Sequence, residues 1–171
     1  MANFNNAFEI MIRNEGGYKL HNVKGDRGGQ TYAGIARNYH PQWPGWRFID
    51  SGNMDNADLT KSVWDFYKTN FWDKIKGDQI TDQTIAETLF DFAVNAGHST
   101  AIKLAQLVID STPDGIVGPN TLGKLNQFDA EEFKVRYALA KVARYAEIVN
   151  RDRDQQKFLL GWINRTLRGL A

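Results

Sequence analysis

Apolar side chains recur at helical spacing over most of this chain, and no segment longer than a few residues alternates with the two-residue period of a strand. The pattern predicts an all-α fold with one small irregular or hairpin segment near residues 18–32. The expected helices cover residues 3–15, 32–39, 59–72, 82–96, 99–109, 119–126, 130–150 and 154–168. Residues 41–57 are loop-like, and Asp58 is the expected N-cap of the helix that follows them.

The first expected helix ends at a carboxylate in an uncommon position. The apolar residues that form one face of this helix are Phe4, Phe8, Met11 and Ile12. At about 100° per residue, Glu15 falls within about 60° of each of them, so it continues the apolar stripe. Gly16 and Gly17 follow, and glycine ends helices because it readily takes the left-handed conformation. An acid placed in this way is a candidate functional group.

A second acid and a hydroxyl follow in a glycine-rich segment. Asp26 lies eleven residues after Glu15, and Thr31 lies five residues after Asp26. A carboxylic acid in apolar surroundings has a raised pKa and can act as a general acid, whereas a solvated one stays ionised. Enzymes that hydrolyse glycosidic bonds typically use two carboxyl groups in such different environments. On this interpretation Glu15 donates the proton, Asp26 stays ionised, and Thr31 helps to hold a water.

A structural interpretation competes with this one. Glu15 can turn outward at the helix end, and Asp26 can cap a turn. The motifs E-G-G and G-D-x-G-G, each taken singly, favour that structural role. Their order and close spacing together favour the catalytic one.

The whole segment resembles a known signature. N-E-G-G-Y followed by G-D-R-G-G-Q-T-Y-A-G-I-A is similar to the N-terminal signature of glycoside hydrolase family 108, a group of N-acetylmuramidases in the lysozyme-like superfamily. F-W-D-K-I-K-G-D-Q-I, E-T-L-F-D-F-A-V-N-A-G and P-D-G-I-V-G-P-N-T-L-G-K-L-N resemble the rest of that family and the small peptidoglycan-binding region that usually follows it. The match weakens only in residues 41–57.

This resemblance implies a lysozyme-like helical fold. Residues 1–93 would form the catalytic region and residues 94–171 a peptidoglycan-binding-like helical region, packed into one unit. The resemblance further implies cleavage of the β-1,4 bond between N-acetylmuramic acid and N-acetylglucosamine in peptidoglycan. Glu15 corresponds to the family's catalytic glutamate, Asp26 to the second acid and Thr31 to the hydroxyl that positions water.

Further residues are candidates for substrate binding, namely Gly17, Tyr18, Gly29, Asp91 and Asn95. The aromatic face of Tyr18 suits the apolar side of a pyranose ring, and backbone at the two glycines can approach a sugar closely. Asp91 and Asn95 belong to a polar stripe of the kind that usually faces solvent. The resemblance of D-F-A-V-N-A-G to the family favours their facing the cleft.

Composition excludes several classes of function. The net charge of +1 provides no basic field for nucleic acid, and the absence of cysteine excludes a thiol nucleophile or a thiolate metal site. His21, His40 and His98 lack the spacing of metal ligands, so we expect no metal or cofactor. Trp43 and Trp46 are equally suited to a sugar subsite and to the core.

We also expect a monomer that neither enters a membrane nor carries a secretory signal in its first seventeen residues. Such an enzyme, made in the cytoplasm, would reach the peptidoglycan glycan strands through a holin pore, as an endolysin does, or by another export route.

Two other functions remain open. The first is a peptidoglycan-binding or secretion-accessory protein without activity, against which the intact Glu15 argues. The second is an enzyme of the same fold with other chemistry, such as a lytic transglycosylase. A transglycosylase needs no positioned water, so Asp26 and Thr31 would be dispensable and the product would be a 1,6-anhydro sugar.

Overall fold

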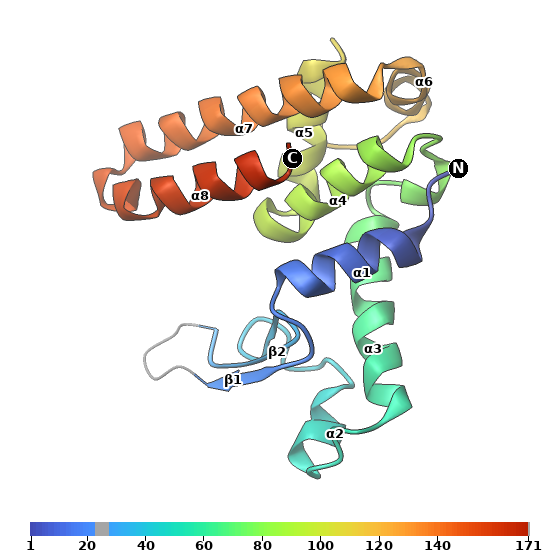
Figure 1. The fold of residues 1–171 in the computed structure, drawn as a ribbon, viewed down its shortest axis with the longest axis vertical. Coiled ribbons are helices and arrows are strands. Elements are labelled where there is room, and N and C mark those ends of the chain that lie inside the picture. The colour runs from blue at the N-terminus through green and yellow to red at the C-terminus, as the bar shows by residue number, and fades with distance from the viewer. Residues whose placement is uncertain (23–27, 171) are drawn as a thin grey trace. The chain divides into compact units, whose positions relative to one another are not determined.

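The computed structural model of this chain describes residues 1–22 and 28–170. Two compact units make it up, one formed by Asn3–Asp73 and the other by Met1–Ala2 with Lys74–Ala171 (Figure 1). The units therefore separate before α4 (Gln83–Ala96), whereas the regions expected from the family resemblance meet within that helix, at residues 93 and 94.

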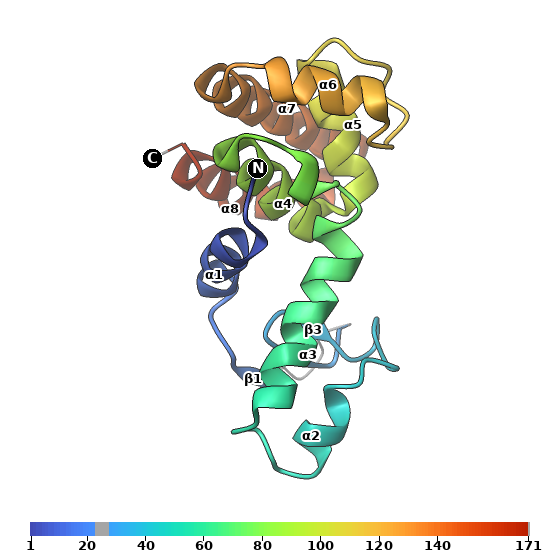
Figure 2. The ribbon, with the colours of Figure 1, turned by 90° about the vertical axis from the view of Figure 1, so that its right-hand side faces the viewer.

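The first unit contains helices and one small antiparallel sheet (Figures 1 and 2). Its elements are α1 (Phe4–Asn14), β1 (Leu20–Asn22), β2 (Gln30–Tyr32), β3 (Ile35–Ala36), α2 (Trp46–Asp50), α3 (Ala57–Tyr67) and a π-helical turn (Lys68–Trp72). The strand order is β1-β2-β3, with Thr31 opposite His21 on one side and Ala36 on the other. The expected hairpin near residues 18–32 is confirmed.

Aromatic side chains hold α1 against α3. The ring of Phe4 meets Trp64 edge to face at 4.9 Å, and the ring of Phe8 lies 6.1 Å from Tyr67. The indole Nε1 of Trp64 donates a hydrogen bond to Asn5 Oδ1 at 2.8 Å, which links α3 to α1 beside these aromatic contacts. The apolar face expected for the first helix is therefore the face that packs in the core of this unit.

The prediction of a short helix at residues 32–39 is wrong. Tyr32, Ile35, Ala36 and Tyr39 have helical spacing, but they lie in β2, β3 and the turns beside them. Ala33 and Gly34 have φ values of +48° and +81°. Two successive positive values are typical of the type I′ turn that joins antiparallel strands, so the chain forms a tight hairpin here.

Two smaller expectations also need correction. The segment 41–57 contains the short helix α2, whose Trp46 and Ile49 are buried. Asp58 does not cap α3, because the side chain of Asn56 accepts the hydrogen bond from the backbone N–H of Asp58 at 2.7 Å. Both residue types cap helices well, and the backbone enters α3 two residues earlier than expected.

The second unit is helical. After a 3₁₀ turn (Gly77–Gln79) it contains α4, α5 (His98–Val108), α6 (Pro119–Gln127), α7 (Ala130–Arg151), a second 3₁₀ turn (Arg153–Gln155) and α8 (Gln156–Arg168). These bounds confirm the expected helices to within two residues. In Figure 1, α7 and α8 run side by side in opposite directions. At the centre, Tyr137 stacks on Phe133 at 5.2 Å and donates a hydrogen bond to the carbonyl of Ala101 at 2.9 Å.

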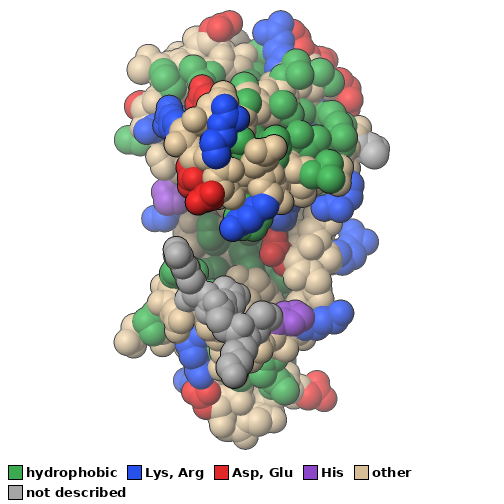
Figure 3. All heavy atoms as spheres, turned by 90° about the vertical axis from the view of Figure 1, so that its left-hand side faces the viewer, with side chains coloured by type: hydrophobic (Ala, Val, Ile, Leu, Met, Phe, Trp, Pro, Cys, Tyr) green, Lys and Arg blue, Asp and Glu red, His purple; other side chains and the backbone are tan. Residues whose placement is uncertain are grey.

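The surface carries charges of both signs. Figure 3 shows basic and acidic side chains interspersed on one face, in agreement with the net charge of +1. Among residues 1–22 and 28–170, no helix is both long and apolar enough to cross a lipid bilayer.

Candidate active site

Glu15 stands where α1 ends, and two hydrogen bonds fix that end. The N–H of Gly16 donates to the carbonyl of Arg13 at 3.2 Å, and the N–H of Gly17 donates to the carbonyl of Ile12 at 2.8 Å. Gly16 and Gly17 have φ values of +88° and +80°. This is the Schellman arrangement, in which residues with positive φ satisfy the last helical carbonyls. The glycine pair therefore fixes the backbone at Glu15, whose side chain is half-buried.

The turn between β2 and β3 lies against the Glu15 carboxyl group. A methyl group placed on Gly34 would lie 3.5 Å from Glu15 Oε2 and 2.5 Å from Tyr67 Oη. The phenol of Tyr67 in turn donates a hydrogen bond to the carbonyl of Ala33 at 2.8 Å. Three segments that are distant in sequence, namely the end of α1, the β2–β3 turn and α3, thus meet around one carboxyl group.

Tyr67 is held in its neutral form. Burial raises the pKa of its phenol above the ordinary value, and the negative charge of Glu15 raises it further. A phenol has a single proton, and Tyr67 commits it to the Ala33 carbonyl. Tyr67 therefore supports the turn beside Glu15 and does not exchange protons near neutral pH.

The two other residues expected to act in catalysis are Asp26 and Thr31. Asp26 lies outside the described residues, so its role stays a prediction. Thr31 is half-buried in the middle of β2, where its Oγ1 donates a hydrogen bond to the carbonyl of Gly29 at 3.3 Å. The structure thus gives the Thr31 hydroxyl a local acceptor, and its role in holding water also stays a prediction.

The sugar-binding candidates near Glu15 differ from one another. Tyr18 is 41% exposed, and its ring centroid lies 6.5 Å from that of Tyr32. At Gly17 no atom of the described residues lies within 4 Å of the position that a methyl group would take, so these residues leave the backbone open there. At Gly29 that position is 2.9 Å from the side-chain amide of Asn38, which gives this glycine a packing role. Sugar contacts by all three remain predictions.

Asp91 and Asn95 lie on α4, in the second unit. Asp91 Oδ1 is 3.8 Å from the guanidinium of Arg165, and Asn95 Nδ2 donates to the carbonyl of Asp91 at 2.6 Å. Burial lowers the pKa of Lys141 on α7, and the charge of Asp91 partly opposes that shift. Asp91 therefore has cationic neighbours within its own unit, and the expected role of both residues in the cleft stays a prediction.

Sequence reasoning did not find Gly34 and Tyr67, the residues that bring the turn to Glu15. It left Trp43 and Trp46 open, and both side chains are buried, with 7% and 4% of their surface exposed. Trp46 donates its indole N–H to the carbonyl of His40 at 2.7 Å and belongs to the core. Trp43 is a core residue that also forms part of a pocket wall beside α3. Among the described residues, no group of three or more His, Asp or Glu side chains could hold a metal ion.

Comparison with known proteins agrees with these features. Residues 8–97 match the family model described as glycosyl hydrolase 108, and residues 100–167 match one described as a predicted peptidoglycan domain. The solved structure of SagA from Brucella abortus resembles this chain with a TM-score of 0.72. The two share 23% sequence identity over 98% of this chain and 91% of that one, which shows a common fold. No curated protein matches the chain.

Proposed function

Because this chain belongs to the glycosyl hydrolase 108 family, and is therefore a glycoside hydrolase, we propose that it is an N-acetylmuramidase. The enzyme would cleave the β-1,4 linkage between N-acetylmuramic acid and N-acetylglucosamine. The match of residues 100–167 to a peptidoglycan domain supports peptidoglycan as the material on which the enzyme acts. The observation that carries the proposal is the Glu15 carboxyl group, fixed by a glycine pair at the end of α1 and flanked by the β2–β3 turn.

In the proposed reaction Glu15 protonates the oxygen of the departing sugar. Its position suits that task, because the half-buried side chain is bordered by the turn at Gly34 and by the neutral phenol of Tyr67. Asp26 would activate a water on the opposite face of the sugar or stabilise the oxocarbenium-like transition state, and Thr31 would orient that water. Tyr18 and the open backbone at Gly17 would contact the glycan beside the acid.

The test is digestion of purified peptidoglycan by the wild type and by Glu15→Gln, with mass spectrometry of the products. We expect muropeptides that end in reducing N-acetylmuramic acid from the wild type. General-acid catalysis contributes roughly 10²–10⁴-fold, so we expect the variant to lose activity by that factor. Glu9→Gln is the matched control, because Glu9 is an exposed carboxylate on the same helix. It should keep full activity.

Other outcomes would point to other functions. Products that end in 1,6-anhydro sugars would identify a lytic transglycosylase, and Asp26→Ala and Thr31→Ala would then remain active. Binding to cell walls without products, under conditions in which a known lysozyme works, would identify a peptidoglycan-binding or secretion-accessory protein. Asn95→Ala with undiminished activity would remove Asn95 from the proposed cleft.

We also propose that the enzyme acts as a monomer on the cell wall, after endolysin-like release through a holin pore or another export route. The peptidoglycan-domain match supports action at the wall. Expression in bacteria with and without a co-expressed holin tests the route: lysis that requires the holin supports release through its pore, and lysis without it supports another route. Light scattering of the purified protein tests the monomer, and a mass of twice 19.4 kDa would contradict it.

A further inference from the structure

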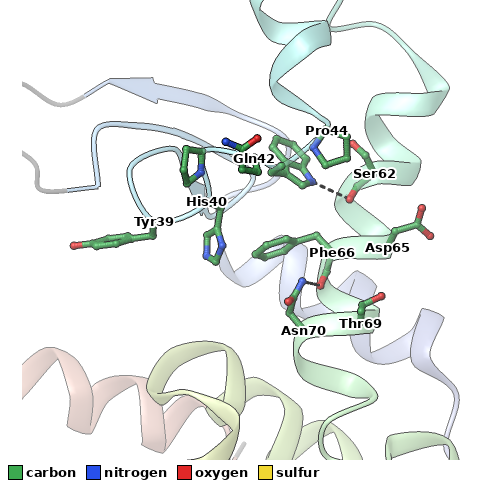
Figure 4. Close-up of a pocket in the computed structure, with 11 residues that line it drawn as sticks. Tyr39, His40, Gln42, Pro44, Ser62, Asp65, Phe66, Thr69 and Asn70 are labelled. Atoms are coloured by element: carbon green, nitrogen blue, oxygen red, sulfur yellow. Dashed lines mark hydrogen bonds between the residues drawn. The ribbon is translucent and has the colours of Figure 1, made fainter.

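A pocket in the first unit lies between the loop after β3 on one side and the second half of α3 with the following π-helical turn on the other. Its volume is about 530 Å³, within the range of small-molecule sites, and residues 39–44 and 62–70 contribute its walls (Figure 4). Glu15, Gly34 and Tyr67 are not among the lining residues, so this is a different place from the catalytic acid. We propose that it binds a neutral N-acetylglucosamine unit of the glycan strand. This inference rests on the proposed function, which makes the glycan the substrate.

The walls of the pocket are held in place before any ligand arrives. Trp43 donates its indole N–H to the carbonyl of Ser62 at 3.1 Å, which ties the loop to α3. The His40 ring meets the Phe66 ring edge to face, with centroids 4.7 Å apart. Figure 4 shows these two rings turned toward each other, with Asn70 in the π-helical turn that follows α3. A site that needs no reorganisation loses less free energy on binding a ligand.

The lining combines the two kinds of surface that a sugar needs. Phe66, His40 and Trp43 provide aromatic surface for the apolar side of a pyranose or for an acetamido methyl group. Gln42 and Thr69 are exposed, and their side chains make no hydrogen bond with other described residues. Asn70 uses one amide hydrogen on the carbonyl of Phe66, at 2.8 Å, and an amide group has further donors and acceptors. Few polar groups around an apolar floor are typical of a small-ligand site.

Charge decides which sugar of the glycan fits. Among the described residues that line the pocket there is no lysine or arginine, and the acidic one is Asp65. The carboxylate of Asp65 is paired with Lys61 at 2.7 Å on the surface of α3. N-acetylmuramic acid carries a lactyl carboxylate and, in the wall, a stem peptide. The described lining residues offer no lysine or arginine to pair with that carboxylate, so the uncharged N-acetylglucosamine is the favoured ligand.

Helix α3 connects this pocket to the catalytic acid. Phe66 lines the pocket, and the next residue, Tyr67, donates its hydrogen bond to the turn beside Glu15. The Tyr32 ring of β2 stacks on Trp43 with centroids 6.3 Å apart, which gives a second connection through the sheet. A sugar bound in the pocket would therefore hold a glycan strand on the same unit that carries Glu15.

The experiment uses the full chain with Glu15→Gln and a ¹⁵N label, titrated with the monosaccharides N-acetylglucosamine and N-acetylmuramic acid and followed by NMR. We expect N-acetylglucosamine to shift amide signals of residues 39–44 and 62–70, and N-acetylmuramic acid to bind at least about fivefold more weakly. Gln42→Ala and Thr69→Ala should each weaken N-acetylglucosamine binding by roughly three- to tenfold, the usual effect of one neutral hydrogen bond. Thr60→Ala is the matched control, because Thr60 is exposed on α3 but does not line the pocket.

Digestion of peptidoglycan by the wild type is measured in parallel, so that the two proposals can fail separately. Digestion without amide shifts at the pocket, or with shifts confined to residues around Glu15, overturns the pocket proposal and leaves the muramidase. Equal binding of the two sugars overturns the charge argument for N-acetylglucosamine. Shifts at the pocket that Gln42→Ala and Thr69→Ala weaken, in a chain that digests nothing, support the pocket and overturn the muramidase.

Discussion

The contact of the β2–β3 turn with Tyr67 can be tested by adding a methyl group at Gly34. Gly34→Ala places a Cβ 2.5 Å from Tyr67 Oη, at a residue with φ of +81°. The backbone conformation alone costs an alanine about 1–2 kcal/mol. Displacing the packed phenol, together with its hydrogen bond to Ala33, adds about 1–3 kcal/mol. We therefore expect Gly34→Ala to lower the free energy of unfolding by about 3 kcal/mol.

Three further variants separate these contributions. Gly52 has φ of +74°, and no atom within the described part of the chain lies within 4 Å of its methyl position, so Gly52→Ala should cost only the backbone contribution of about 1–2 kcal/mol. Tyr67→Phe removes the hydroxyl and leaves the buried Ala33 carbonyl without its partner, a loss of about 1–3 kcal/mol. In the double variant Gly34→Ala with Tyr67→Phe the overlap is gone. The loss of unfolding free energy in the double variant should be smaller than the sum of the losses in the two single variants, by about 1–2 kcal/mol.

Urea unfolding of the four variants, at constant m value, measures these differences. The same preparations assayed on peptidoglycan should show a larger loss of activity for Gly34→Ala than for Gly52→Ala, because only Gly34 borders Glu15. Equal destabilisation by Gly34→Ala and Gly52→Ala would refute the contact with Tyr67. Additive losses in the double variant would refute it as well.

Three other predictions concern stability. Asn56→Ala should lower the free energy of unfolding, measured with urea, by about 1 kcal/mol, because it removes the side chain that caps α3. An equal loss in Asp58→Ala would contradict the assignment of Asn56 as the cap. Gln106 is fully buried, and its side chain forms hydrogen bonds with Asp114, Ile116, Thr121 and the N–H of Gly115. Gln106→Leu should therefore lower the free energy of unfolding by at least about 2 kcal/mol. Leu107→Gln, at the exposed neighbour, should lower it by less than about 0.5 kcal/mol. Because the pKa of Tyr67 is raised in the folded state, the unfolded chain loses this proton first above about pH 10, and the free energy of unfolding falls as the pH rises further. Tyr67→Phe should make that fall shallower in urea unfolding at pH 9–11, and equal slopes would show that Tyr67 does not cause it.

Much of the helical structure could be predicted because its signals are local. Helix α6 begins with Pro119 after Gly118, and α4 begins after Asp82, whose side chain accepts from the N–H of Ile85 at 3.0 Å. Gly97, with φ of +85°, separates α4 from α5 as expected. In each case the residue that starts or ends a helix acts on backbone within one turn, so neighbouring letters suffice.

The errors arose where local signals compete. Residues 32–39 have helical spacing of apolar side chains and also contain Ala33-Gly34, which takes positive φ values in a hairpin turn. The strands β2 and β3 are three and two residues long, too short to show a two-residue period. Pairing with β1 and the hydrogen bond from Tyr67 to Ala33 favour the hairpin, and both depend on residues outside the segment.

By itself, the sequence determined where the candidate acid lies and how the chain leaves it. Four apolar residues at helical spacing, Glu15 and a glycine pair specify a helix that ends in a Schellman turn, because every hydrogen bond involved is within six residues. Only the tertiary structure brought Gly34 and Tyr67 to that carboxyl group and placed Trp43, His40 and Phe66 around one pocket. The residues around the carboxyl group lie up to 52 positions apart in the sequence, from Glu15 to Tyr67, and packing selects their arrangement from many that the sequence pattern allows.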